Sequence, residues 1–308
     1  MAAKSNSAAD EIIAAIKAGK FGQRELPHRV AVPATTWPGA EQAIFAAIDP
    51  ETFTQLKKDR QAHLATLEAQ AQRVHNEAVN VAAERQAALV AAADARRRDI
   101  GGLAIGQSEF LQTPFFIWGD PDYRIESVAQ PGNSFAKFKY HRFQNGTDWV
   151  SFWFMWTNDD TESAAIDISG ELLVNGSMAV RANGGNLDLI TTSATLQTML
   201  QPLQWWAQPQ TQPTPAPASQ SNLIKQLVAT AHWYSRDSLL ATDVFGTTSV
   251  SWNAFIVPAH STAVFKMSFE FSHGIDDGTA DVDFETGAFA VTCPGILVQR
   301  NRFRPLHE

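Results

Sequence analysis

The chain has little of the chemistry that many enzymes and metalloproteins depend on. Cys293 is the only cysteine in 308 residues, so an intrachain disulfide and a zinc site built from several thiolates are excluded. Because Pro294 follows it in an apolar run, we interpret Cys293 as a small buried hydrophobic residue. No glycine-rich phosphate loop and no Gly-x-Ser-x-Gly elbow occurs. The eight histidines are scattered, without the i, i+4 pair of zinc proteases. The sequence therefore predicts a protein that is not an enzyme and needs no cofactor.

Positive charge is also scarce. Lysine and arginine number 24 against 32 aspartates and glutamates, which gives a net charge of −8. Residues 1–100 are nearly balanced, with 13 basic and 12 acidic side chains, whereas residues 101–308 hold 11 and 20. The only basic cluster, Arg96 to Arg98, lies at the end of a predicted helix, where cations favour the negative end of the helix dipole. Nucleic acid, which needs clustered positive charge, is not an expected partner.

Long apolar runs are missing as well. No segment approaches the roughly 20 apolar residues that span a bilayer, and the N-terminus leads into a charged amphipathic stretch rather than an apolar signal-peptide core. We expect synthesis in the cytoplasm without a signal peptide, followed by incorporation into a particle or release by another route. A membrane-active toxin is a less favoured alternative. The Ala-rich stretch 82–95 would have to insert, and its charged residues Glu84, Arg85 and Asp94 are costly at the bilayer centre.

Glycine and proline are absent from residues 51–100, which predicts one long helix over about 50–100. Asp49 is a suitable N-cap, Pro50 suits the first helical position, and Gly101-Gly102 is expected to end the helix. At 1.5 Å per residue this helix would be on the order of 70 Å long. Capping residues and apolar spacing predict two shorter helices before it, at 8–18 and 39–47.

Apolar side chains recur every three or four positions along the long helix, which is the spacing of a coiled coil. Arg60 and Arg85 interrupt the stripe, and its second half contains mostly Ala and Val. The helix could pack on the β-domain of its own chain or on other copies. We favour a homo-oligomer, because neither short helix could cover so long a stripe. The candidate oligomerisation residues are the large apolar members of the stripe: Phe53, Leu56, Leu64, Leu67, Val74 and Val81.

From Phe110 onward the apolar period becomes two, as in β-strands. The clearest strand is 265–272, in which Phe265, Met267, Phe269 and Phe271 alternate with polar residues. A hairpin is predicted around Glu285-Thr286-Gly287 between strands at 280–284 and 288–291. Asn-Gly pairs at 145–146 and 175–176 predict turns. Further strands are predicted at 135–140, 150–156, 164–173, 177–181, 227–234 and 250–257.

These elements predict a segregated α+β fold. A helical region, residues 1–100, precedes an antiparallel β-sandwich or jelly-roll-like domain, residues 101–308. Eight of the nine tryptophans fall between Trp118 and Trp252, and large aromatics favour sheet surfaces. A Pro/Gln-rich tract at 208–221 is interpreted as a surface connection between strands. A parallel nucleotide-binding sheet is not expected, because strands and helices do not alternate.

One acidic cluster is a candidate metal site. Calcium needs six to eight oxygen ligands, which turns can provide, but the EF-hand spacing is absent. Aspartate also favours turns through bonds to its own backbone. A solvated acidic turn is therefore the preferred interpretation and no metal site is predicted. The weak calcium candidates are Asp276, Asp277, Asp281 and Asp283.

Two functions remain in view. The favoured hypothesis is a structural or assembly protein: an oligomeric component of a particle, fibre or appendage that displays β-sandwich domains to other assembly proteins or surface glycans. The alternative is a β-sandwich module that binds carbohydrate or another ligand. Exposed aromatic rings can stack on sugar faces, and Trp205 and Trp206, beside the Pro-rich tract, are the candidates for that role.

Overall fold

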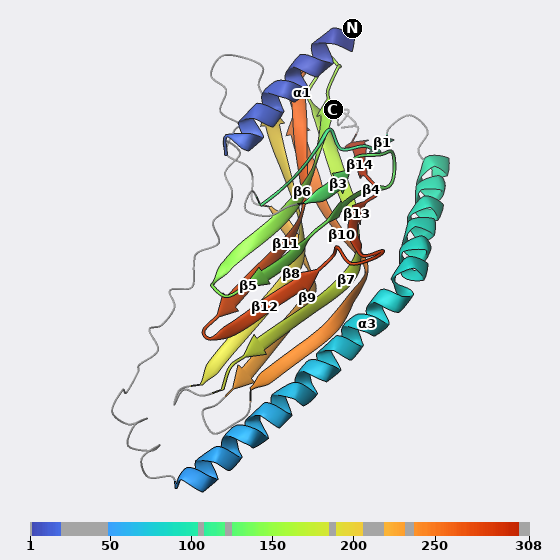
Figure 1. Cartoon of the computed structure of the whole chain (residues 1–308). Coiled ribbons are helices and arrows are strands. Elements are labelled where there is room, and N and C mark those ends of the chain that lie inside the picture. Colours follow the sequence, from blue (N-terminus) through green and yellow to red (C-terminus); the bar gives the residue numbers. More distant parts are fainter. Residues whose placement is uncertain are drawn as a thin grey trace, which may run out of the picture.

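The computed structural model describes residues 2–19, 49–103, 108–120, 125–184, 189–205, 219–231 and 237–301. Within these ranges the fold is α+β, as predicted, with two helices and two antiparallel sheets (Figure 1). The predicted helix at 39–47 and most of the tract at 208–221 lie outside the described residues. No helix of the described part is long and apolar enough to cross a membrane.

Two predicted helices are confirmed with shifted ends. α1 spans Ala2–Lys17 and begins six residues before the predicted start. α3 spans Pro50–Leu103, and the Asp49 side chain caps it by accepting hydrogen bonds from the amides of Glu51 and Thr52 at 3.0 and 2.9 Å. The expected stop at Gly101-Gly102 is wrong by a short margin, because the helix continues through both glycines. Glycine in a helix costs only about 1 kcal/mol relative to alanine.

The larger sheet, sheet A, is organised around β7, which runs over Ala164–Ala182. One edge of β7 pairs with β10 (Ser238–Val257) along nearly its full length. The other edge pairs in succession with β12 (Gly278–Asp283), β13 (Ala290–Cys293) and β14 (Ile296–Asn301). The remaining strands of sheet A are short: β1 (Ser108–Leu111), β3 (Glu126–Val128), β4 (Ser134–Lys137) and β5 (Lys139–Arg142).

Sheet B has the order β2-β6-β11-β8-β9. Its central strand, β11 (Thr262–Ile275), confirms the strand predicted at 265–272. Phe269 of β11 contacts Phe138 and Phe284 of the facing layer, with ring centroids 5.5 and 4.9 Å apart, so the core lies between the two sheets. The other strands of sheet B are β2 (Phe116–Gly119), β6 (Gly146–Thr157), β8 (Ile190–Trp205) and β9 (Gln220–Ala231).

Two local predictions in this region are wrong. Asn175-Gly176 forms no turn but lies within β7, where the Asn175 amide donates to the carbonyl of Ala82 at 2.8 Å. A side chain at Gly176 would meet Phe284 at 2.5 Å, so the glycine permits close packing rather than reversal of the chain. The hairpin at 280–291 is also wrong. β12 and β13 do not pair with each other, because β7 is long enough to pair with both in succession.

The two helices cover opposite outer faces of the sandwich (Figure 1). α3 runs along the outer face of sheet A, where Leu89 and Ala93 pack on Leu173 of β7. On sheet B, Ile12 and Ile16 of α1 pack on Trp153, Leu203 and Val264. The long helix therefore packs on its own β-sheet, which is one of the two arrangements that the sequence left open.

The apolar stripe predicted for α3 only partly matches the face that packs. Leu56 is 53% exposed and Val81 is 37% exposed. The other four candidates, Phe53, Leu64, Leu67 and Val74, are half-buried. In the second half of the helix the packed residues are Ala78, Ala82, Leu89 and Ala93. Self-association through the stripe stays a prediction.

Candidate functional site

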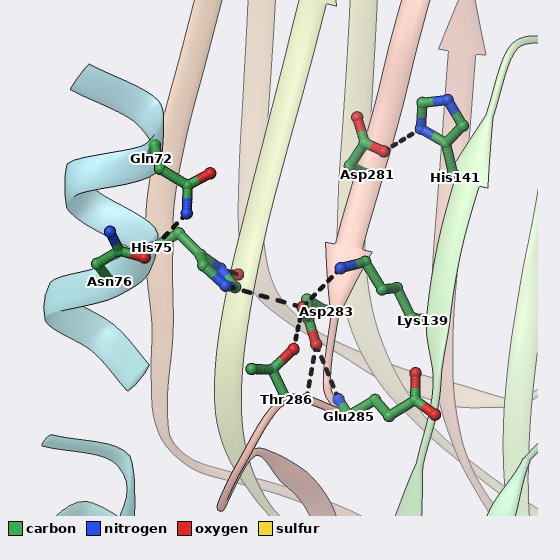
Figure 2. Close-up of polar contacts among 10 residues, drawn as sticks. Gln72, His75, Asn76, Lys139, His141, Asp281, Asp283, Glu285 and Thr286 are labelled. Atoms are coloured by element: carbon green, nitrogen blue, oxygen red, sulfur yellow. Dashed lines mark hydrogen bonds and ion pairs between the residues drawn. The ribbon is translucent and has the colours of Figure 1, made fainter. Parts of the chain in front are cut away.

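A cleft with a volume of about 450 Å³ lies between α3 and the outer face of sheet A. Its helical wall carries Glu68, Gln72 and His75, and the opposite wall consists of residues from β5, β7, β10 and β12. Figure 2 shows polar residues of both walls. Its apolar lining comes from both elements: Ala71, Val74, Ala179, Leu239 and Ala241. The cleft thus combines an apolar surface with charged and amide groups.

His75 connects the helix to the sheet at one end of the cleft. Its Nδ1 lies 3.0 Å from Oγ of Ser177, an outward-facing residue of β7, and its Nε2 lies 4.0 Å from Oδ2 of Asp283. The Phe289 ring forms a T-shaped contact with the imidazole, with 5.9 Å between the ring centroids. These contacts fix the position of the helix relative to β7 and β12.

Asp283 is the most constrained charge in the cleft. Its Oδ1 accepts from the backbone amides of Glu285 and Thr286 at 2.9 and 3.0 Å, and its Oδ2 accepts from the Thr286 hydroxyl at 2.7 Å. Lys139 donates to the same Oδ2 at 3.0 Å. Burial raises the pKa of this carboxyl, but the hydrogen bonds lower it by more, so the net pKa lies below its ordinary value. Asp283 stays ionised and holds the Lys139 ammonium at the cleft wall.

The remaining polar groups are also held by neighbours. Asp281 accepts hydrogen bonds from His141 and, at 3.1 Å, from Thr279. The side-chain nitrogen of Gln72 donates to the side-chain oxygen of Asn76 at 2.8 Å (Figure 2). The side-chain oxygen of Gln72 can then accept a hydrogen bond from a ligand. The cleft therefore presents fixed donors next to fixed acceptors.

Ser177, His75 and Asp283 are the residue types of a hydrolytic triad, but their arrangement differs from one. Asp283 already accepts four hydrogen bonds from other groups and lies 4.0 Å from the ring, whereas an orienting carboxylate hydrogen-bonds the imidazole. Ser177 lies in the middle of β7, which pairs with β10 on one edge and β12 on the other. Its neighbouring amides are used by the sheet and do not form an oxyanion hole. The geometry suits ligand binding better than nucleophilic attack.

The four calcium candidates fall into two groups. Asp281 and Asp283 line the cleft, whereas Asp276 and Asp277 are exposed. Asp276 accepts from the amide of Thr191 at 3.1 Å. Among the residues that the structure describes, no group of three or more His, Cys, Asp or Glu side chains could hold a metal ion.

Sequence reasoning missed most of the cleft. The two aromatic residues that the sequence suggested for sugar binding cannot be placed, because the side chain of Trp205 and all of Trp206 lie outside the described residues. His75, Lys139 and Ser177 were not selected. The alternation along β7 marks Ser177 as outward-facing, but only the docking of α3 brings His75 next to it.

The sequence matches no protein-family model and no curated protein. Among solved structures, TmCBM61 in complex with β-1,4-galactotriose aligns over 60% of this chain and 88% of its own, with 7% identity and a TM-score of 0.23. The CBM22-1 xylan-binding domain of Xyn10C from Paenibacillus barcinonensis covers 65% and 99%, with 7% identity and a TM-score of 0.22. The family 11 carbohydrate-binding module from Clostridium thermocellum covers 61% and 96%, with 9% identity and a TM-score of 0.21. Scores this low do not establish a shared function.

Proposed function

We propose that this protein is a non-catalytic carbohydrate-binding protein whose cleft between α3 and sheet A holds a neutral sugar. The observation that carries the proposal is the presence of a held donor, Lys139, and a held acceptor, Asp281, beside the apolar surface of the same cleft. Each sugar hydroxyl both donates and accepts a hydrogen bond, so it is recognised best where both partners lie side by side. The volume lies within the range usual for small-molecule sites, about 300–1,000 Å³.

Named groups supply each part of this recognition. Lys139 donates and Asp281 accepts, and both are held in place by neighbours before any ligand arrives. Such preorganisation reduces the entropy lost on binding. The C–H faces of a sugar ring would pack on Val74 and Leu239, which belong to the apolar lining. A charged donor or acceptor makes a stronger hydrogen bond than a neutral one.

Calorimetric titration with neutral mono- and disaccharides and β-linked oligosaccharides tests the proposal. We expect Lys139→Met and Asp281→Asn each to weaken binding at least about tenfold, the effect of losing about 1.4 kcal/mol. Gln226→Ala, on the exposed part of β9, is the control and should bind as the wild type does. Unchanged affinity in both cleft variants, or no binding to any of these sugars, would overturn the proposal.

We also propose that the protein self-associates through the first half of α3, as a component of a larger assembly would. Leu56 is 53% exposed in the single chain, and Phe53, one turn before it, is half-buried. A second copy of the helix would bury these side chains. The Leu56 variant in the Discussion provides the test.

A further inference from the structure

The long helix contacts sheet A at both ends of the cleft. At one end His75 lies 3.0 Å from the hydroxyl of Ser177. At the other end Glu68 forms an ion pair with Arg181 of β7 at 3.5 Å. A ligand longer than the cleft therefore extends across the strands of the sheet rather than along the helix.

The strands β12 and β5 form one side of the cleft, and their outward-facing side chains are exposed toward the edge of the sheet. The register pairs Asp283 with Lys139 and Asp281 with His141. Both Lys139 and His141 are exposed. Among the described strands, β5 pairs with β12 alone, so these two side chains lie at the outer edge of this part of the sheet.

Phe143 follows β5 directly, and its side chain is 63% exposed. Its ring makes a T-shaped contact with the imidazole of His141, with 4.4 Å between the ring centroids. His141 in turn is hydrogen-bonded to Asp281, which lines the cleft (Figure 2). At about 3.3 Å per residue, Phe143 lies roughly 13 Å from Lys139 along the chain, which is further than one sugar ring spans. An exposed aromatic ring thus lies beside the cleft and is connected to it by residues in contact.

The turn that carries Phe143 is held from behind by β11, the central strand of sheet B. The carbonyl of Gln144 accepts a hydrogen bond from Nδ1 of His273 at 2.6 Å. The side chain of Asn145 accepts another from the amide of Ile275. A single exposed apolar side chain on a surface needs no explanation by itself. An aromatic ring on a turn that is already fixed, next to a cleft, loses little conformational entropy when a ligand packs on it.

We propose that Phe143 forms a second sugar subsite beside the cleft, so that the preferred ligand is an oligosaccharide whose chain crosses β12 and β5. This inference rests on the function proposed above. One sugar ring occupies the cleft, the chain passes Asp281 and His141, and a later ring packs its C–H face on the ring of Phe143. Aromatic side chains provide a large, rigid apolar face for such a contact. The subsite therefore selects for chain length.

Calorimetric titration of the intact protein with glucose, xylose and galactose, each as the monosaccharide and as the β-1,4-linked hexasaccharide, tests the subsite. We expect Phe143→Ala to weaken hexasaccharide binding at least about fivefold and to leave monosaccharide binding unchanged. Phe143→Trp should retain hexasaccharide binding, whereas Phe143→Leu should behave as Phe143→Ala does, because it lacks an aromatic face. Leu223→Ala, at a site on β9 that is 59% exposed, is the control and should bind as the wild type does.

The cleft and the subsite fail in different ways. Lys139→Met should weaken the binding of both lengths, since each places a ring in the cleft. Equal hexasaccharide affinity in the wild type and Phe143→Ala, with binding lost in Lys139→Met, overturns the subsite and leaves the cleft proposal standing. Loss of monosaccharide binding in Phe143→Ala also overturns it, because the ring would then belong to the cleft itself. If no hexasaccharide binds to the wild type, both proposals are overturned.

Discussion

Arg85 of α3 forms an ion pair with Asp243 of β10, at 2.7 Å, and its guanidinium lies 4.8 Å from the ring centroid of Phe245. The other arginine that interrupts the apolar stripe, Arg60, pairs with the buried carboxylate of Asp237, also at 2.7 Å. The two residues that break the coiled-coil pattern are therefore residues that connect the helix to its own sheet.

The mismatch between the predicted stripe and the packed face has a geometric cause. A strict stripe of three- and four-residue steps repeats every 3.5 residues, whereas a straight helix has 3.6 residues per turn, so the stripe drifts by about 20° per heptad. Over the length of α3 this drift rotates Val81, Ala88 and Ala92 away from the sheet, where they are exposed. Ala82 and Leu89 take the packed positions instead.

The docked helix predicts opposite effects at two adjacent alanines. Ala82 is 0% exposed and packs near Phe289, whereas Ala83 is exposed. Ala82→Leu should lower the free energy of unfolding by about 1–3 kcal/mol through overpacking. Ala83→Leu, which is the same change one residue on, should alter it by less than about 0.5 kcal/mol. Urea unfolding of both variants is the measurement, and equal stability of the two would argue against the docking of α3 on sheet A.

The sequence predicted which segments form helices and strands better than it predicted which of these segments contact one another. The long helix and β11 were recognisable because capping, period and the absence of Gly and Pro agree within each segment. The partners of β7 were not, because its 19 residues pair with strands that are far away in sequence. The cleft was missed for the same reason. His75 and Ser177 are 102 positions apart, and neither carries a motif that predicts their contact.

Stability should depend on pH through Asp148. Burial raises the pKa of this carboxyl, but hydrogen bonds from His273 and Arg142 lower it by more, so the net pKa is below 3.8. Because folding lowers the pKa of Asp148, its carboxylate stabilises the folded state fully above about pH 3.8. This stabilisation is lost as the pH falls through the lower pKa of the folded state. Asp148→Asn removes the buried carboxylate that pairs with both Arg142 and His273 and should cost about 3–5 kcal/mol at pH 7.

Unfolding free energies of the wild type and Asp148→Asn, measured from pH 7 to pH 2.5, test this dependence. The difference in unfolding free energy between the two proteins should be constant above about pH 5 and should shrink below pH 3.8. Asp159→Asn, at an exposed site, is the control and should follow the wild type throughout. A difference that does not change with pH would show that the Asp148 charge does not stabilise the fold.

Cys293 should be unreactive in the folded protein. Its side chain is 0% exposed, and burial raises the pKa of the thiol to about 12, so very little nucleophilic thiolate exists near pH 8. We expect a colorimetric thiol reagent to label less than about a tenth of the protein over an hour in buffer and all of it in urea. Rapid labelling under native conditions would mean that β13 opens readily from the sheet.

Self-association through α3 predicts a change of mass without a change of fold. Leu56 is 53% exposed in the single chain, so Leu56→Asp should leave the melting temperature of the monomer unchanged. If a second copy buries this side chain, the substitution places an unpaired charge in the interface once per subunit and should abolish association. Light scattering should then give an oligomer for the wild type and a monomer for the variant.

The control for Leu56→Asp is another exposed apolar residue of α3 that lies outside the proposed interface. Val81 is 37% exposed and lies in the part of α3 that packs on sheet A, beyond the first half of the helix. Val81→Asp should therefore keep the wild-type mass, since the interface is confined to the turns before it. A wild type that is monomeric at high concentration, or a Leu56→Asp variant that keeps the oligomer, would rule out this surface. Loss of association only in Val81→Asp would place the interface on the second half of the helix instead.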